Sequence, residues 1–236
     1  MAYLAQQPPV LRRRHARRRG LFATPALLVA AALVAAGYVA YVLWPRWPEA
    51  QVALDAPAVP VVVAGVVFNI EPAAIRNSVQ RRPGTQERVD LSYLWPSLEP
   101  PDPTNRPSVG APADPNERIF VTIQNADGTL PLMERVQTIY PRYLVSEPTA
   151  GPAGLTLRAF RKDTPYSNEE LVFESVKPEH FLARCSRQGV VNSGSCLLER
   201  RVGKADITVR FPRDWLKDWQ SVATGIDALV ARLHPN

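Results

Sequence analysis

Residues 21–44 (LFATPALLVAAALVAAGYVAYVLW) restrict the fold of this chain more than any other segment. These 24 residues contain no charged side chain. As a helix they would be roughly 36 Å long, which is enough to cross a hydrocarbon core of about 30 Å. The sequence therefore predicts a transmembrane helix, with the lipid bilayer as a partner. Aromatic residues gather at its far end, as they do at a headgroup boundary: Tyr38, Tyr41, Trp44 and Trp47.

Six arginines precede this segment, and no acidic residue occurs before Glu49. They are Arg12, Arg13, Arg14, Arg17, Arg18 and Arg19. By the positive-inside rule, we expect this basic arm (residues 1–20) to stay in the cytoplasm and the chain after residue 44 to lie across the membrane. The arm also suits contact with lipid headgroups or docking of a cytoplasmic partner. A cleaved signal peptide is the competing interpretation. The apolar region of a signal peptide is usually about 7 to 15 residues long, however, and the apolar stretch here is longer.

Small residues form a stripe within the apolar segment, where Ala32, Ala36 and Ala40 repeat every fourth residue. Such a stripe allows another transmembrane helix to approach closely, so these alanines are candidates for helix packing. Chance is the alternative explanation, because the segment contains eight alanines among its 24 residues.

Composition argues against nucleic acid as a partner of the remaining chain. The net charge of +6 comes from 28 basic and 22 acidic residues, so without the six arginines of the arm 22 basic residues balance 22 acidic ones. A folded basic surface is therefore not indicated. Arginine outnumbers lysine by 24 to 4, which favours a GC-rich bacterial gene. The membrane would then be a bacterial inner membrane, and the compartment beyond it a periplasm.

After the membrane segment, we expect a tether at residues 45–60 and one domain at residues 61–236. Residues 61–70 are a β-branched run typical of one buried strand, and Pro72 suits the start of a short helix. Residues 96–115 hold seven prolines. This density predicts an exposed loop with polyproline II character, either a plain insertion or a ligand for a Pro-recognising groove.

Alternating and helical periodicities define the rest of the domain. Alternation indicates strands at 89–95 and 118–124 and then a meander, with a short helix at 130–140 before it. The meander strands are expected at 155–161, 170–176, 181–187, 195–201 and 205–211. After Pro212, apolar residues recur at spacings of three and four: Trp215, Trp219, Val222, Ile226, Leu229 and Leu233. The sequence thus predicts an α+β fold, a mainly antiparallel sheet backed by an amphipathic C-terminal helix.

The two cysteines, Cys185 and Cys196, lie on neighbouring strands of this predicted meander. We expect a structural disulfide between them, which an oxidising periplasm would permit. A redox-active or metal-bound pair is the alternative, but redox pairs usually have the closer Cys-x-x-Cys spacing. Zinc would need two more ligands, and His180 is the only nearby imidazole.

Motifs for catalysis and cofactor binding are missing from the sequence. It contains no nucleophile elbow, zinc-protease, P-loop or dinucleotide motif, so we predict no catalytic, metal or cofactor-binding residues. Glu169 and Glu170 would point to opposite faces of a strand and so would not cooperate as acid and base. The favoured function is a single-pass inner-membrane protein whose periplasmic domain binds or scaffolds proteins, as an accessory or assembly subunit of a membrane complex. The alternatives are a tethered enzyme or small-ligand binder and, less favoured because the arm is short, a signal receptor.

Overall fold

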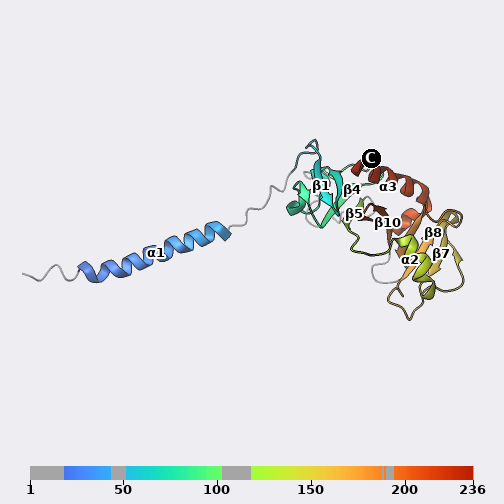
Figure 1. The fold of residues 1–236 in the computed structure, drawn as a ribbon, viewed down its shortest axis with the longest axis horizontal. Coiled ribbons are helices and arrows are strands. Elements are labelled where there is room, and N and C mark those ends of the chain that lie inside the picture. The colour runs from blue at the N-terminus through green and yellow to red at the C-terminus, as the bar shows by residue number, and fades with distance from the viewer. Residues whose placement is uncertain (1–18, 44–51, 103–117, 188, 190–193, 236) are drawn as a thin grey trace, which may run out of the picture. The chain divides into compact units, whose positions relative to one another are not determined.

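A computed structural model of the chain describes residues 19–43, 52–102, 118–187, 189 and 194–235 (Figure 1). The chain divides into two compact units, Met1–Arg46 and Trp47–Asn236, which are described separately. The first unit contains helix α1 (Arg19–Leu43). Within it, Pro25–Val42 is long and apolar enough to cross a membrane, a character that a signal sequence near an N-terminus shares.

The second unit is an α+β domain, as the sequence predicts, but it contains two sheets where the sequence predicts one. The smaller sheet has the strand order β2-β1-β3 and contains β1 (Val59–Val63), β2 (Val66–Ile70) and β3 (Gly84–Thr85). β1 and β2 are antiparallel, whereas β3 runs parallel to β1.

The prediction of one strand over residues 61–70 is wrong, because the chain turns back at Ala64 and Gly65. Both residues have positive φ, 52° and 81° respectively. Positive φ at both central residues is what a tight two-residue hairpin turn needs to match the twist of its strands. The run of valines therefore forms two strands, and alternate side chains such as Val61 and Phe68 enter the core.

The segment after Pro72 forms two short 3₁₀ turns instead of one helix. These are η1 (Pro72–Ala74) and η2 (Ser78–Gln80). Between them, Ile75 forms a β-bridge with Leu91, and the amide of Arg76 donates to the carbonyl of Asp90 at 2.9 Å. This pairing with the sheet edge replaces the hydrogen bonds that would continue a helix.

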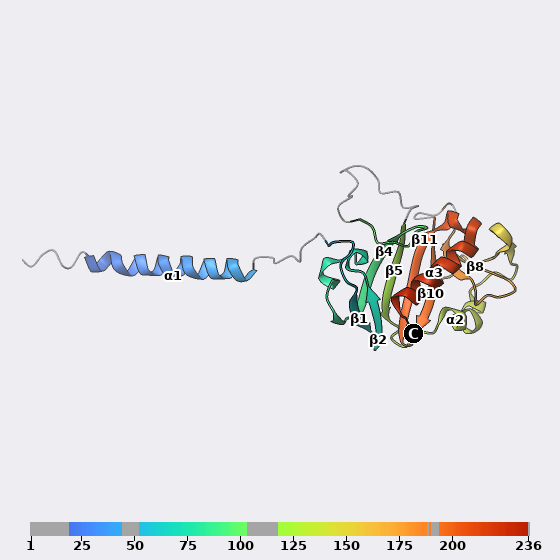
Figure 2. The same cartoon turned by 90° about the horizontal axis from the view of Figure 1, so that it is seen from above.

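The larger sheet has the strand order β4-β5-β11-β10-β9-β8-β7-β6 (Figure 2). Its strands are β4 (Arg88–Leu94), β5 (Arg118–Asn125), β6 (Thr149–Ala150), β7 (Thr156–Ala159), β8 (Glu169–Phe173), β9 (Leu182–Ser186), β10 (Ser195–Val202) and β11 (Ala205–Pro212). All neighbouring strands are antiparallel. The predicted meander is confirmed, because β7 to β11 are consecutive neighbours. The pairing of β5 with β11 joins the two halves of the sheet.

The C-terminal helix α3 (Trp219–Leu233) follows the 3₁₀ segment η6 (Arg213–Asp218) and lies across one face of the larger sheet (Figure 2). The predicted apolar stripe is buried, apart from the half-buried Trp215. It packs with inward-facing side chains of both sheets in the main core. Full burial of each such Leu, Ile or Val side chain contributes about 1.5–3 kcal/mol.

A second, smaller core lies under helix α2 (Leu132–Thr138) and the 3₁₀ segment η4 (Tyr140–Arg142). Its buried members are Leu132, Tyr140, Leu144, Phe160, Leu171 and Leu182. The sheet residues among them alternate with main-core residues such as Val172 and Ala183. The α2 segment therefore covers β7, β8 and β9 on the side opposite the main core.

The predicted Pro-rich loop is described only from Pro96 to Asp102, where the chain has no regular structure beyond a turn. Residues 103–115 lie outside the described part of the chain.

Candidate protein-binding face

On the side of the larger sheet opposite α3, no helix of the described residues covers β4, β5, β11 and β10; we call this side the open face. Strand alternation explains it: Val121 and Val209 are buried in the main core, whereas Phe120 and Thr208 beside them are half-buried. The register places Ser92, Phe120, Arg210 and Leu197 in one cross-strand row. The row continues to Arg184 on β9, where the α2 segment begins to cover the sheet.

Each carboxylate that the described strands place on the open face is paired with an arginine. The Asp90 carboxylate accepts from Nη2 of Arg88 at 2.8 Å, and the Asp206 carboxylate accepts from Nε of Arg201 at 2.6 Å. Glu199 pairs with Arg135 of α2. These acidic groups are therefore engaged within the domain.

The carboxyl group of Asp90, on this face, has a pKa that its neighbours shift. Partial burial acts to raise its pKa, but hydrogen bonds with the side chains of Arg88, Thr122 and Gln80 have the larger combined effect and lower the pKa. The pKa of Asp90 consequently lies below its ordinary value. The carboxylate stays ionised at neutral pH and fixes Arg88, which lies two residues away on the same strand.

Three arginines that form no ion pair with another described residue gather around Phe120. The guanidinium carbon of Arg76 lies 4.7 Å from the centroid of the Phe120 ring. Arg210 is directly opposite Phe120 on β11, and Arg118 is two residues away on β5, so their side chains point to the same side of the sheet. We call Arg76, Arg118, Phe120 and Arg210 the arginine patch.

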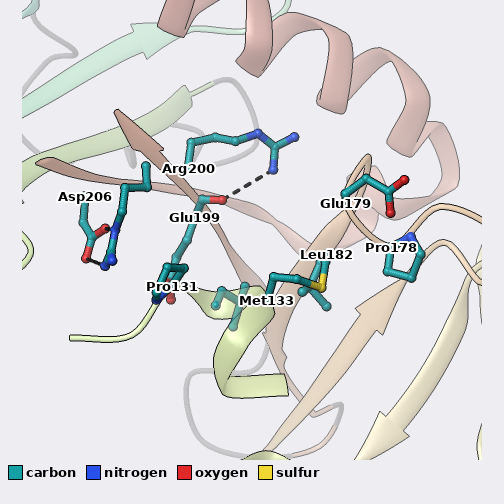
Figure 3. A pocket seen from close by; sticks show the side chains of 10 residues that line it. Pro131, Met133, Pro178, Glu179, Leu182, Glu199, Arg200 and Asp206 are labelled. Carbon is teal, nitrogen blue, oxygen red and sulfur yellow. Dashed lines mark hydrogen bonds and ion pairs between the residues drawn. The ribbon is translucent and has the colours of Figure 1, made fainter. Parts of the chain in front are cut away.

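A groove lies at the α2 end of the open face (Figure 3). It has a volume of about 180 Å³ and is lined by Pro131, Leu132, Met133, Pro178, Glu179, Leu182, Glu199, Arg200, Arg201 and Asp206. Met133 and Leu182 lie close together at its apolar side, and Asp206 lies away from them (Figure 3). Asp206 forms an ion pair with Arg201, which also lines the groove. Small-molecule pockets usually measure about 300–1,000 Å³. The groove is thus smaller than a typical small-molecule pocket and has room for one or two amino-acid side chains.

Two other hollows lie elsewhere in the domain. One, of about 310 Å³, is polar and lined by Glu87, Arg88, Gln124, Asn125 and Asp127. The other, of about 260 Å³, lies between the segment 150–157 and η6. Among the residues that the structure describes, no three His, Cys, Asp or Glu side chains are grouped so as to hold a metal ion.

The predicted disulfide between Cys185 and Cys196 is present. The two cysteines are direct cross-strand partners on β9 and β10, their Cα atoms are 4.0 Å apart, and both side chains are fully buried. Zinc is therefore not bound through these thiols. His180 instead places Nδ1 at 2.9 Å from Oε2 of Glu174.

The adjacent glutamates of β8 point to opposite sides, as expected from strand alternation. Oε2 of Glu169 lies 3.0 Å from Nε of Arg184. The two atoms form an ion pair but no hydrogen bond, because the N–H of Arg184 does not point at this oxygen. Glu170 pairs with Arg213 on the other side. Each carboxylate is bound by its own arginine, so the two do not act as a pair.

The residues predicted for the membrane segment are only partly described. Ala32, Ala36 and Ala40 lie on α1 with exposed side chains, and their packing against another helix stays a prediction. Arg12, Arg13, Arg14, Arg17 and Arg18 lie outside the described residues, and Arg19 is the first residue of α1.

Sequence reasoning missed the groove and the arginine patch. Alternation in residues 118–124 does place Arg118 and Phe120 on the polar side of their strand. The pairing of β5 with β11, which brings Arg210 beside them, joins distant parts of the sequence and leaves no local signal.

Comparison with known proteins gives similarity of shape only. No protein-family model matches the chain, and no match was found among curated proteins. An immunity protein of the Stenotrophomonas maltophilia type IV secretion system, Smlt3025, is 17% identical with a TM-score of 0.47, covering 75% of this chain and 93% of that protein. The iron-regulated outer membrane lipoprotein FrpD of Neisseria meningitidis is 12% identical with a TM-score of 0.41, covering 76% of this chain and 95% of that one. At these identities and TM-scores, neither similarity establishes a shared function.

Proposed function

We propose that this chain is a single-pass inner-membrane protein whose periplasmic domain binds a protein partner through the open face, as an accessory or assembly subunit of a membrane complex. Three features support the location. The segment Pro25–Val42 has the length and composition of a membrane span. Six arginines precede it, which by the positive-inside rule leaves the N-terminus in the cytoplasm. The buried disulfide fits an oxidising compartment.

The single observation that carries the binding function is the open face itself. Four adjacent strands of the larger sheet lack a covering helix among the described residues, and their outward side chains combine Phe120 and Leu197 with arginines. Aromatic residues and arginine are enriched where proteins bind each other. The groove beside α2 adds a cavity of about 180 Å³ for an anchoring side chain.

The groove is also the place where the function is best tested. Met133 lies half-buried at its apolar side, so Met133→Glu would place a charge where a partner's apolar side chain is expected to bind. A matched control is Val67→Glu, which makes the same kind of change at a residue of β2 with 47% of its surface exposed.

The experiment is gentle detergent extraction of the chain from native membranes, followed by chemical crosslinking and mass spectrometry of the co-purifying proteins. A partner in stoichiometric amount should accompany the wild type and Val67→Glu but not Met133→Glu, while all three unfold at similar temperatures. If the wild type is recovered as a lone protein, the binding function is refuted. If the partner stays with Met133→Glu, the groove is not its binding site.

A further inference from the structure

Resting on the proposed function, we propose that the arginine patch recognises an acidic segment of the protein partner, with Asp or Glu carboxylates bound by Arg118 and Arg210 beside Phe120. The partner surface is therefore rich in carboxylates rather than neutral or basic.

The first step of the argument is the placement of the three arginines. Arg210 and Phe120 are direct cross-strand neighbours, and Arg118 lies two residues before Phe120 on β5, so Arg118 and Arg210 are diagonal neighbours on one side of the sheet. Diagonal neighbours in an antiparallel pair are about 7–8 Å apart. Arg76 reaches the same place from the segment between η1 and η2, with its guanidinium over the Phe120 ring. Three positive charges thus surround one aromatic ring.

The second step is the charge balance of the open face. Its carboxylates, those of Asp90, Asp206 and Glu199, are each held by another arginine. Among the described residues, by contrast, neither Arg118 nor Arg210 forms an ion pair, and Arg76 contacts only the ring of Phe120 through its side chain. Among the residues that the structure describes, the patch is consequently a positive region without a carboxylate partner, beside acidic groups that are bound by other arginines. Electrostatic complementarity favours a negatively charged partner there.

The third step is the chemistry of the side chains. A guanidinium group is planar and presents a fork of donors that matches a carboxylate with two parallel hydrogen bonds. The guanidinium of Arg76 lies over the Phe120 ring, and its N–H groups form no hydrogen bond with a described residue, so they are available to a carboxylate. Ser92, the cross-strand neighbour of Phe120, is 3% exposed, and its hydroxyl has no hydrogen-bond partner in the described structure. A polar group is therefore still unsatisfied directly beside the patch.

An acidic protein segment fits this site better than anionic lipid. Surfaces that lie in a membrane interface present apolar side chains that insert between the lipids, usually together with several lysines or arginines. Here the aromatic ring is half-buried under Arg76, and none of the four lysines of the chain belongs to the patch. The four-stranded surface suits an extended protein segment.

The test uses the full-length chain in nanodiscs of neutral phosphatidylcholine. The probes are fluorescein-labelled short peptides of alternating Glu and Thr, with Gln/Thr and Lys/Thr peptides for comparison, and binding is measured by fluorescence anisotropy. We expect the Glu/Thr peptide to bind at least about 10-fold more tightly than the Gln/Thr peptide. Its affinity should fall as salt is raised from low to physiological concentration.

The decisive variant is Arg118→Glu/Arg210→Glu, which should weaken binding of the Glu/Thr peptide by about 100-fold. The matched control is Arg82→Glu/Lys217→Glu, which changes the net charge equally at exposed residues outside the patch and should alter affinity by less than about 2-fold. If the Glu variant does not fold, Arg118→Gln/Arg210→Gln serves in its place, with an expected loss of about 10-fold.

Each alternative outcome overturns the proposal. Equal losses in the patch variant and the control would show that net charge alone attracts the peptide. Absence of Glu/Thr binding, combined with slower amide hydrogen exchange at residues 118–122 when phosphatidylglycerol is added to the nanodiscs, would make the patch a lipid surface. If the native partner still co-purifies with Arg118→Glu/Arg210→Glu, the acidic-segment inference fails while the binding function stands.

Discussion

Gly225, in the middle of α3, lies so close to the indole of Trp95 that a Cβ atom at position 225 would be 2.7 Å from Cζ3 of the ring. Trp95 follows β4 and stacks on Trp215, with ring centroids 5.0 Å apart. The missing side chain at position 225 therefore lets the helix approach the end of the sheet.

Gly225→Ala should destabilise the domain, although alanine favours helices more than glycine by about 1 kcal/mol. The added methyl group must displace a stacked indole ring, and overpacking typically costs about 1–3 kcal/mol. Thr224→Ala, at the exposed neighbouring position, is the matched control and should be neutral or slightly stabilising. Thermal unfolding of the full chain in detergent measures both. A gain in stability for Gly225→Ala would show that the indole of Trp95 does not prevent a side chain at position 225.

Loss of the disulfide should destabilise the domain by about 3 kcal/mol, because closing a loop of this size restricts the unfolded chain. The cysteines lie 11 positions apart in the sequence and are fully buried. The double variant Cys185→Ala/Cys196→Ala should therefore unfold at lower denaturant than the oxidised wild type, and wild type refolded under reducing conditions should resemble the variant. Identical urea midpoints for variant and oxidised wild type would contradict a stabilising role.

Asp90 should make the domain sensitive to acid. Its pKa in the folded state is lowered, so the unfolded chain, with an ordinary pKa of about 3.9, takes up the proton first. The carboxylate thus stabilises the fold above about pH 4, and this contribution is lost as the pH falls through the lower folded-state pKa.

Asp90→Asn tests this dependence. The variant should be less stable than wild type at pH 7 by about 1–2 kcal/mol, with the difference shrinking toward pH 3. Asp163→Asn, at a side chain that is 75% exposed, is the control and should change little at either pH. Urea unfolding at the two pH values is the measurement. If the difference in free energy of unfolding between Asp90→Asn and wild type is the same at both pH values, Asp90 does not have a lowered pKa in the folded state.

The basic arm should determine how the chain is oriented in the membrane. Replacing Arg12, Arg13, Arg14, Arg17, Arg18 and Arg19 by Gln should yield mixed orientations, whereas replacing them by Lys keeps the charge and should keep the orientation. Protease added to spheroplasts should digest the domain of the wild type and the Lys variant and leave a protected fraction in the Gln variant. Complete digestion of the Gln variant would refute the charge argument.

Local periodicity in the sequence is sufficient to predict most of this fold. Alternation in residues 118–124 predicts β5, and the spacing of Trp219, Val222 and Ile226 predicts a helix with one buried side. The hairpin at Ala64 and Gly65 is missed, because an Ala-Gly pair inside a run of valines lacks the usual Asn-Gly or Asp-Gly turn signal. The one predicted helix after Pro72 is replaced by two 3₁₀ turns because Ile75 pairs with Leu91, a tertiary contact.

The candidate site is less predictable than the fold, since it depends on which strands become neighbours. Phe120 and Arg210 are recognisable separately as outward-facing residues, but only the pairing of β5 with β11 places them side by side. The groove likewise requires α2 to pack beside β9 and β10, so that Met133 meets Leu182.

The most direct test of the central claim is site-specific photo-crosslinking in native membranes. A benzoylphenylalanine is introduced at Leu197 on the open face or, for comparison, at Ala228 on the exposed side of α3. If the open face binds a protein partner, irradiation should give a discrete crosslinked product of higher mass from position 197 and little from position 228. Crosslinking from position 228 but not from 197, or no protein product from either, would contradict the claim.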